Sequence, residues 1–589
     1  MLGSLLGILM LLAGAVVTAA VLRGSGARML SHLGVASRSD PPAPAPRLVR
    51  LNWTVSAGTV APAGGAPTPV LLVNGVWPAP AVELDESDIV ELYLSNAQPQ
   101  PVSVHWHGVA QRGTPRADGA AHASAPPLQQ GAAGVLVARF TASPAGTHLW
   151  HGHAGLTAAA GLHGPLIVRE RDARRLPPYD GEATLLLSDF WRMPLDALRT
   201  GLLQRAPAFR WVGDPDALLV NGINANANAS HTATVALPRG ATVRLRLINA
   251  ASLSCLSLAA EGHSLRVVQA DGADVAPLDA GEVLLNAGER LSVLLTPSPA
   301  ARAAGVVWLT VAIRHRPHGP FGVVALTLPP ENNNDAQSQA ATPASSLPAP
   351  PAGPLPAQSA WNDTAATVAF YSSLRAAEGA PPPPPPPPGA PLLLRGSQAY
   401  VDGLMRWTVN DLAFAYPGDP LLAEGSQGAP PAPMGTLDAS DAFPGMADAT
   451  MLDVAVAAAA GAAPAAAAER SWADASTLSL PAPRMGTSVV TLPLGAVRDV
   501  VLLNGAALNG VNEQHPWHLH GGLFWLMGLG EGPWPPLQGR AAPPPAKRPP
   551  QRDTLTLPPG GWAWIRIAAD NAGVCACPAR TQPCACQLV

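Results

Sequence analysis

Short runs of hydrophobic residues, many alternating with polar ones, are separated by Gly and Pro along most of the 589 residues. Alternation with a period of two is typical of β-strands with one buried face, and Gly and Pro mark the turns between them. Short strands at this spacing predict an all-β fold built of β-sandwiches. The clearest runs are Val70–Gly75, Asp88–Leu94, Val102–His107, Leu166–Val168, Thr234–Leu237, Thr242–Leu247, Leu265–Val268, Leu291–Leu295 and Val306–Val311.

The same pattern divides the body of the chain into three sandwiches joined by less regular segments. Residues 331–357 are rich in Asn, Ala, Ser and Pro, and this composition predicts a linker. A proline run predicts an extended polyproline II loop at 381–391, and residues 438–476 are an Ala-rich insert, predicted as a loop or a marginal helix. The predicted sandwiches cover roughly 46–172, 178–330 and 358–574.

Composition narrows the class of protein. Charged residues make up only 13% of the chain, and the net charge of −4 with a pI near 6.4 shows no basic footprint for nucleic acid. The 67 prolines and 56 glycines suit a turn-rich β architecture. The body contains a single cysteine, Cys255, so disulfide bonds do not hold the sandwiches together.

The first 45 residues read as a targeting segment. Leu2–Leu22 is an apolar run followed by Arg23, and about twenty such residues can span a bilayer. The segment is either a signal peptide cleaved near Ala20 or an uncleaved membrane anchor at residues 2–22. Both alternatives place the body outside the cytoplasm; a cytosolic protein with a fortuitous apolar start is the third. Three glycosylation sequons, at Asn52, Asn228 and Asn362, favour the secretory alternatives.

Three pairs of histidines with one residue between them carry the strongest chemical signal. Residues i and i+2 of a strand share one face, so each pair can present two imidazoles to a transition metal such as copper, zinc or iron. A single pair is often a surface or core feature, but three pairs, each with a glycine beside or within it, predict a metal cluster. The pairs are His105 and His107, His151 and His153, and His518 and His520.

A seventh histidine, His515, lies three residues before His518. This odd separation turns it toward the opposite strand face, so it would serve a different metal ion or none. The eight remaining histidines show no paired spacing: His32, His122, His148, His163, His231, His263, His315 and His318.

The residues around these pairs resemble the multicopper oxidases, and among them the plant-type ascorbate oxidases and laccases. The resemblance runs from near Arg47 to Val574. The stretches that carry it are His105–Gly119, Gly146–His153 with Ala160–Val168, and His515–Trp525 with Gly530–Gly532.

This resemblance implies three cupredoxin-like Greek-key β-sandwich domains and four copper ions. It implies that a type 1 copper takes single electrons from a small-molecule reductant and that a trinuclear cluster reduces dioxygen to water. By position, His105 and His518 would hold the type 2 copper, and His515 would be a type 1 ligand. Asp118 matches an acidic position that helps with protons, although it is equally a turn residue before Gly119. The type 3 pair would be held by His107, His151, His153 and His520.

The C-terminal end departs from the family pattern. The family's fourth motif, His-Cys-His, should follow Val574, but residues 575–589 contain cysteines instead and no histidine follows His520. By resemblance, the type 1 site is then incomplete and the cluster keeps six of eight ligands. We hypothesise that this tail is a mistranslated or unspliced end of the gene, which sequencing the 3′ end of the transcript would test. Alternatives are a disordered, oxidisable tail or a soft-metal clip made of Cys575, Cys577, Cys584 and Cys586.

Two functional classes remain from the sequence. One is a copper-dependent oxidase that uses ascorbate, a phenol or a metal ion as reductant, and the segments Gln111–Pro115 and Gly530–Gly532 favour the ascorbate oxidase type. The other is a catalytically incomplete copper-binding protein that lacks a type 1 site. In both, the first and third sandwiches must pack face to face to bring the pairs together, with the second sandwich as the spacer. Binding sites often lie between domains.

Overall fold

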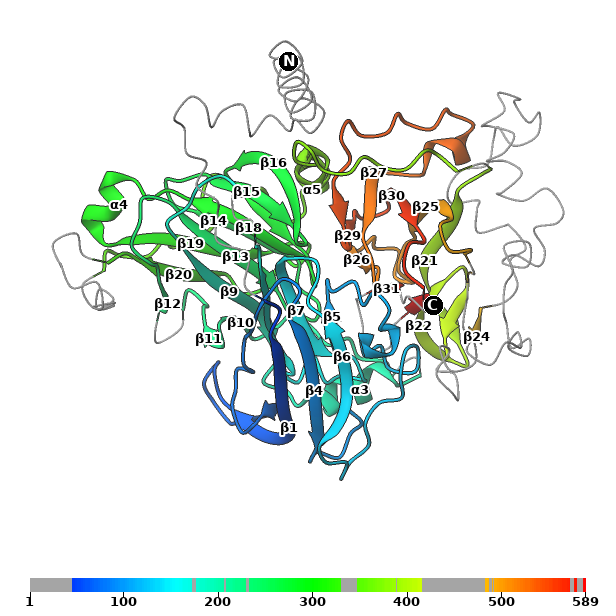
Figure 1. Cartoon of the computed structure of the whole chain (residues 1–589), viewed down its shortest axis with the longest axis horizontal. Helices are drawn as coiled ribbons and strands as arrows, with labels where there is room; N and C mark the ends of the chain where they lie inside the picture. The colour runs from blue at the N-terminus through cyan, green and yellow to red at the C-terminus, as the bar shows by residue number, and fades with distance from the viewer. Residues whose placement is uncertain are drawn as a thin grey trace, which may run out of the picture. The chain divides into compact units, whose positions relative to one another are not determined.

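Six β-sheets make up most of the described part of the chain (Figure 1). The computed structural model describes residues 45–171, 176–205, 208–228, 232–329, 347–387, 389–415, 483–486, 490 and 492–572, together with the backbone of two short C-terminal strands. The predicted targeting segment, most of the 331–357 linker and the Ala-rich insert 438–476 lie outside these residues. Pro46–Val589 forms one compact unit, and none of its described helices is long and apolar enough to cross a membrane.

The predicted all-β class is confirmed, because strands dominate the described residues and helices are few and short. The first sandwich packs two four-stranded sheets around a core that includes Trp53, Trp106 and Trp150. Its first sheet contains β1 (Leu48–Val60), β2 (Thr68–Val73), β4 (Ile89–Asn96) and β6 (Val135–Thr141). Its second sheet contains β3 (Val82–Asp85), β5 (Val104–His107), β7 (Gly146–Gly152) and β8 (His163–Arg169).

The second sandwich packs a seven-stranded sheet on a five-stranded one. The larger sheet contains β9 (Gly181–Phe190), β10 (Ala217–Val220), β11 (Ile223–Asn224), β13 (Val243–Asn249), β15 (Leu265–Ala270), β16 (Ala273–Ala280) and β18 (Arg290–Leu295). The smaller contains β12 (Ala233–Ala236), β14 (Leu256–Ala260), β17 (Val283–Leu285), β19 (Val306–Ile313) and β20 (Gly322–Thr327), and the short helices are α3 (Leu195–Leu202) and α4 (Pro299–Ala304).

The strand β13 shows how this sandwich is joined to the first one. Its apolar side chains enter the core, while Arg244 and Arg246 leave from the other face and are nevertheless fully buried. Arg244 pairs with Glu170 at 3.0 Å and Arg246 with Glu182 at 2.8 Å. Arg246 also donates to Thr147 of β7 at 2.8 Å. The alternation of β13 therefore separates a hydrophobic core from a polar seam between two sandwiches.

Glu170→Gln should lower stability in a pH-dependent way. Burial alone would raise the pKa of Glu170, but hydrogen bonds and charge from Arg244 and Arg246 lower it to about 2. A lowered folded-state pKa contributes stability above the unfolded pKa, and this contribution is lost as the pH falls toward 2. We expect E170Q to lose on the order of 2 kcal/mol in urea unfolding at pH 7, with the gap narrowing below pH 4. Glu83→Gln, at an exposed pair with Arg169, is the control and should change little.

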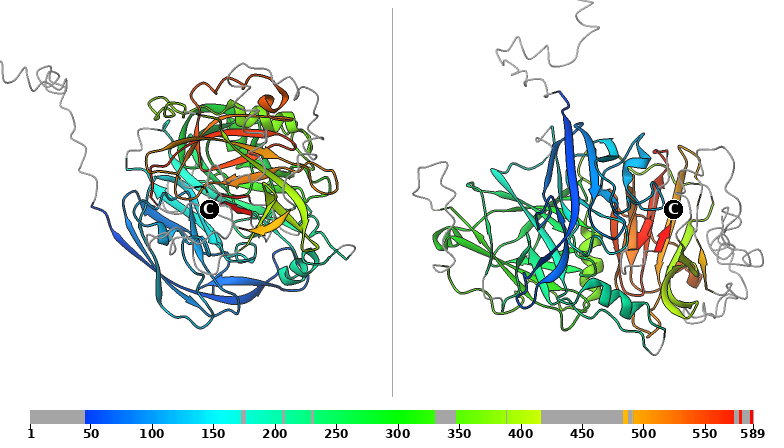
Figure 2. Two further views of the ribbon diagram at one scale, coloured as in Figure 1. Left: turned by 90° about the vertical axis from the view of Figure 1, so that its right-hand side faces the viewer. Right: turned by 90° about the horizontal axis from the view of Figure 1, so that it is seen from below.

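The third sandwich contains an eight-stranded and a four-stranded sheet. The larger contains β21 (Leu392–Val401), β22 (Leu404–Val409), β23 (Leu412–Phe414), β24 (Arg484–Gly486), β25 (Val497–Asn504), β27 (Phe524–Gly530), β28 (Gln551–Arg552) and β30 (Trp562–Ala568). The smaller contains β26 (His515–His518), β29 (Thr554–Leu557), β31 (Cys577–Ala579) and β32 (Cys586–Leu588). The right-hand view of Figure 2 shows the orange and red strands of this sandwich beside the blue and cyan strands of the first one.

The segment before β21 differs from the predicted division at residue 358. Helix α5 (Thr364–Ser373) places Tyr371 and Leu374 in the core of the second sandwich. The proline run that follows lies along the third sandwich, because Trp525 donates to the Pro381 carbonyl at 3.2 Å and Arg566 to that of Pro384 at 2.9 Å. Residues three apart lie on the same face of a polyproline II helix, so these two bonds fix one face of the run.

Candidate metal centre

The first two histidine pairs face each other because their strands are antiparallel neighbours. β5 pairs with β7 in a register that sets His105 opposite His151, and the centroids of these two rings are 5.3 Å apart. His107 ends β5, and His153 follows β7 directly. His153 lies 5.4 Å from His105 between ring centroids. One face of this small sheet therefore presents four imidazoles.

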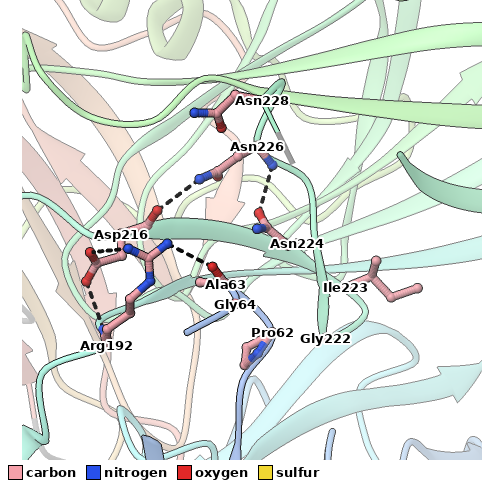
Figure 3. Close-up of a pocket in the computed structure, with 10 residues that line it drawn as sticks. All are labelled: Pro62, Ala63, Gly64, Arg192, Asp216, Gly222, Ile223, Asn224, Asn226 and Asn228. Carbon is pink, nitrogen blue, oxygen red and sulfur yellow. Dashed lines mark hydrogen bonds and ion pairs between the residues drawn. The ribbon is translucent and has the colours of Figure 1, made fainter. Parts of the chain in front are cut away.

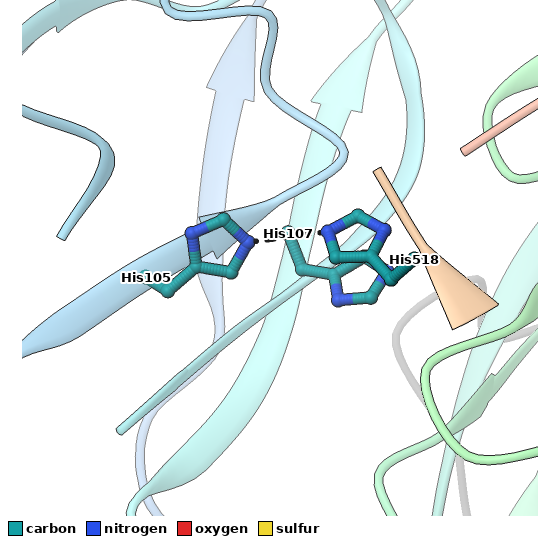
Figure 4. A group of neighbouring side chains, drawn as sticks. All are labelled: His105, His107 and His518. Carbon is teal, nitrogen blue, oxygen red and sulfur yellow. Dashed lines mark hydrogen bonds between the residues drawn. The ribbon is translucent and has the colours of Figure 1, made fainter. Parts of the chain in front are cut away.

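The third pair reaches the same place from the third sandwich. His518 ends β26 and stacks on His107, with ring centroids 3.5 Å apart, while His520 stacks on His105 at 3.8 Å. The Nε2 atoms of His105 and His518 are 3.4 Å apart (Figure 4). The structure thus brings six of the seven predicted histidines into one cluster at the seam between the first and third sandwiches, and all of them except the half-buried His153 are buried.

Hydrogen bonds fix where the protons of several of these rings lie. His105 Nδ1 donates to the Asp118 carbonyl at 2.8 Å, and His518 Nδ1 donates to the Asp553 carbonyl at 2.9 Å. His151 Nδ1 lies 2.8 Å from the Gly152 carbonyl. A carbonyl oxygen only accepts, so Nδ1 of each of these rings carries a proton, and Nε2 is the ring atom that would bind a metal ion.

His107 is held the opposite way round. The Thr554 hydroxyl donates to Asp553 Oδ1 at 2.8 Å, so it accepts from His107 Nε2, which is also 2.8 Å away. The lone pair of His107 is therefore on Nδ1. Imidazole nitrogens gathered in this way suit a transition metal, and the Nε2 atoms of His105 and His518, 3.4 Å apart, are close enough to bind the same ion.

Asp118 connects two rings of the cluster from the short helix η2 (Pro115–Asp118). Its Oδ2 accepts from His520 Nδ1 at 2.8 Å, and its Oδ1 lies 3.3 Å from His105 Nδ1. Burial alone would raise the pKa of Asp118, but the charges and hydrogen bonds of His520 and His105 lower it well below its usual value. The carboxylate therefore stays ionised and keeps the proton of His520 on Nδ1, away from the cluster.

Gly119→Ala should disturb the cluster through the backbone. Gly119 has φ +76°, and an added Cβ would lie 1.8 Å from the Val104 carbonyl oxygen, next to His105. We expect G119A to lose more than the roughly 1–2 kcal/mol of a left-handed alanine and to bind less copper. Gly113→Ala is the matched control, since Gly113 has φ +71° with nothing within 4 Å of the added atom. Equal copper content in both variants would contradict this packing argument.

Two residues to which the sequence assigned no role, Asp553 and Arg290, support the cluster from outside it. Asp553 lies 3.4 Å from His107 Nε2 and receives two hydrogen bonds of 2.6 Å from Arg290. Arg290 begins β18 of the second sandwich and is 0% exposed. The second sandwich therefore does more than set the spacing, because its guanidinium holds the carboxylate that orients two histidines of the seam.

His515 lies apart from the six, as its odd spacing predicts. Its ring packs edge-on against Trp407 at 4.2 Å between centroids and is 4% exposed. Burial lowers its pKa to about 3, so the ring is neutral at pH 7. Neither ring nitrogen forms a hydrogen bond among the described residues. A buried imidazole without a hydrogen-bond partner lowers the folding stability by about 1–3 kcal/mol, and coordination to a metal ion would offset this loss.

A type 1 copper needs a cysteine thiolate as a ligand. Among the described side chains, none supplies one beside His515. Cys255 accepts a hydrogen bond of 3.4 Å from Gln514, but burial raises the pKa of its thiol, so it is not a thiolate at pH 7. The tail cysteines lie outside the described side chains. The tail backbone, however, forms β31 and β32, and β31 pairs with β26 where Trp517 faces Ala579.

Comparisons with known proteins agree with this geometry. Sequence models described as multicopper oxidase match residues 54–173, 181–322 and 462–577. An L-ascorbate oxidase of Cucumis sativus is 30% identical over 548 residues, which cover 87% of this chain and 83% of the relative. Laccase-6 of Oryza sativa subsp. japonica is 29% identical over 539 residues, covering 86% and 85%.

Solved structures share the fold. Fet3p, a multicopper oxidase that functions in iron import, aligns with a TM-score of 0.65 at 20% identity, over 92% of this chain and 90% of its own. The laccase from Botrytis aclada aligns with a TM-score of 0.62 at 19% identity, over 93% and 88%. The predicted architecture of three cupredoxin-like domains is therefore confirmed. Fold and relatives together define a copper-dependent oxidoreductase. The chain belongs to the multicopper oxidase family.

Proposed function

We propose that this protein oxidises a small organic reductant one electron at a time and reduces dioxygen to water. Bound copper would supply the electron transfer and the oxygen chemistry, in which four electrons and four protons convert one O₂ into two waters. The single observation that carries this proposal is the convergence of imidazole rings from two sandwiches, with His105 Nε2 and His518 Nε2 3.4 Å apart. The named relatives, L-ascorbate oxidases and laccases, support it.

The residues divide into four groups. His105 and His518 would hold one copper ion through Nε2, and His515 would bind the separate ion that receives electrons from the reductant. Asp118 would pass protons toward the cluster, since its ionised carboxylate already contacts His105 and His520. The remaining pair of ions would be held by His107, His151, His153 and His520.

The surroundings of His515 favour an organic reductant. Trp407 packs against the His515 ring. Glu513, two residues earlier in the chain, is close enough to Arg316 for the guanidinium charge to act on its pKa. Arg316 stacks over Trp211, with 5.7 Å from Cζ to the ring centroid. Burial raises the pKa of Glu513, so this carboxyl is a poor ligand for a metal-ion substrate. Aromatic faces and one guanidinium suit a planar, electron-rich molecule such as ascorbate or a phenol.

The proposed location is outside the cytoplasm. Leu2–Leu22 would deliver the body to the secretory pathway as a signal peptide or remain as an anchor, and the sequons at Asn52, Asn228 and Asn362 agree with this route. Soluble reductant and dioxygen are then the only partners that the proposal needs.

A second candidate function is a copper-binding protein without complete catalysis. The observation that favours it is the absence of any histidine after His520, where the family's fourth motif is expected. In this case the cluster binds copper through six histidines, but His515 lacks the cysteine of a blue site.

Oxygen uptake separates the two candidates. We expect the copper-loaded protein to be blue and to consume oxygen with ascorbate or a phenol, and much less with ferrous ion. His515→Ala should remove the blue colour and reduce the uptake by at least about 100-fold, because losing even an outer partner of a metal ligand typically costs 10–100-fold. Copper-loaded protein that is colourless and takes up no oxygen with any of the three reductants would favour the second candidate.

A further inference from the structure

A polar pocket of about 530 Å³ lies between the first and second sandwiches, away from the histidine cluster (Figure 3). Its volume is within the usual range for small-ligand sites. The wall combines the turn after β1 with the strand ends around β9, β10 and β11. Its lining residues are Pro62, Ala63, Gly64, Arg192, Asp216, Gly222, Ile223, Asn224, Asn226 and Asn228.

The polar groups of this wall are held in place by one another. Arg192 donates from its side chain to the Ala63 carbonyl and from its backbone to Asp216, both at 2.8 Å. Asn226 donates to the Asp216 carbonyl at 2.9 Å, and its own backbone N–H binds Asn224 Oδ1 at 2.9 Å. The side-chain oxygen of Asn224 therefore accepts a hydrogen bond, while its two side-chain N–H groups donate to none of the described residues and could donate to a ligand.

This set of groups matches the surface of a sugar. Arginine and amide N–H groups can donate to sugar hydroxyls, and the Asp216 carboxylate can accept from them. Ile223 is 48% exposed at the rim and, with Pro62, offers an apolar surface for the ring face of a sugar. The Arg192–Asp216 ion pair is about half exposed and contributes little to folding stability. Stability alone therefore does not explain why these two side chains are held in this arrangement.

Asn228 supplies the second, independent observation. It is an exposed lining residue, and it is also the acceptor position of the sequon Asn228-Ala-Ser. We propose that Asn228 carries an N-linked glycan whose first sugars lie in this pocket. Covalent attachment at the wall gives the sugar an effective concentration of about millimolar or higher, so weak hydrogen bonds suffice to seat it. The inference rests on the secretory location proposed above.

The test is glycan mapping followed by native-state deglycosylation of the full chain from a glycosylating host. We expect an amide-cleaving glycosidase to release the Asn228 glycan about tenfold more slowly than the Asn362 glycan, because one or two hydrogen bonds must open first. Asn362 is an exposed sequon that does not line this pocket. After denaturation the two rates should be equal.

Variants make the test specific. Arg192→Ala should bring the native rate at Asn228 up to that at Asn362, while Ser230→Thr keeps the sequon and Ser230→Ala removes the modification. Equal release rates at Asn228 and Asn362 in the native parent protein would contradict the proposal that the Asn228 glycan lies in this pocket. An unchanged rate at Asn228 in R192A would contradict it as well. An unmodified Asn228 in a protein whose Asn362 carries a glycan would also contradict the proposal. That result would leave the proposed secretory location intact. If none of the three sequons is modified, both the bound glycan and the proposed secretory location are contradicted.

Discussion

Replacing His518 with Ala is expected to remove copper from the cluster and to abolish oxygen reduction while the sandwiches stay folded. His518 is the residue of the third sandwich whose Nε2 faces His105 Nε2, so its loss would remove one of the two ligands proposed for this ion. We expect fewer copper ions per chain by metal analysis. Oxygen uptake should fall by more than the roughly 10–100-fold caused by losing an outer partner of a metal ligand.

The control for this substitution is His163→Ala. His163 begins β8 and its Nδ1 lies 2.9 Å from the Ala158 carbonyl, but it is not one of the six clustered histidines. H163A should keep the copper content and the uptake of the parent protein. Unchanged copper in H518A, with its fold intact by circular dichroism, would count against a shared site at the seam.

Replacing Arg290 with Ala should cost about 3–5 kcal/mol of unfolding free energy, the typical effect of removing one partner of a buried ion pair. Arg290 is fully buried and makes two hydrogen bonds of 2.6 Å to Asp553, and it lies 3.3 Å from Asp271. Its loss leaves the buried Asp553 carboxylate without its guanidinium, while Asp271 keeps its ion pair with Arg552 at 2.6 Å. Urea unfolding at neutral pH measures the change.

Arg266→Ala is the matched control, because Arg266 also makes a two-pronged ion pair in the second sandwich. Its bonds to Asp279 are 2.8 and 2.9 Å, but both side chains are about half exposed. Exposed pairs contribute about 0–1 kcal/mol, so R266A should be nearly neutral. If R290A and R266A cost the same, the buried network does not stabilise the seam in the way we infer.

Alternation in the sequence was enough to locate most strands. The run Thr242–Leu247 became β13 (Val243–Asn249), and Val306–Val311 became β19 (Val306–Ile313). The alternating positions of β13 place its apolar side chains in one core, whereas β19 buries apolar side chains on both faces. In both strands the local pattern agrees with the tertiary structure. The pattern did not show that the polar face of β13 is also buried, because that depends on Glu170 and Glu182, which lie outside the strand.

The histidine cluster was also foreseeable in outline. Period-two spacing places His105 with His107 on one strand face, and the odd spacing of His515 separates it from His518, as the structure has them. Neither spacing reveals which ring nitrogen carries the proton. That depends on acceptors distant in the chain, such as the Asp553 carbonyl for His518. Their identity as copper ligands remains a prediction.

Long-range partners account for what the sequence could not predict. Arg290 and Asp553 are 263 residues apart and belong to different sandwiches, and nothing in the local pattern of either pairs them. The packing of α5 on the second sandwich, through Tyr371, depends equally on a surface formed far away in the chain. The predicted fourth-motif departure concerns residues 575–589, whose side chains lie outside the described structure.

Anomalous X-ray diffraction from the copper-loaded protein, collected on both sides of the copper absorption edge, tests the shared site most directly. We predict a copper peak bonded to His105 Nε2 and His518 Nε2, with further copper among the other four rings. Copper found only at the cysteine tail or on surface histidines, with the seam free of anomalous signal, would contradict the central claim.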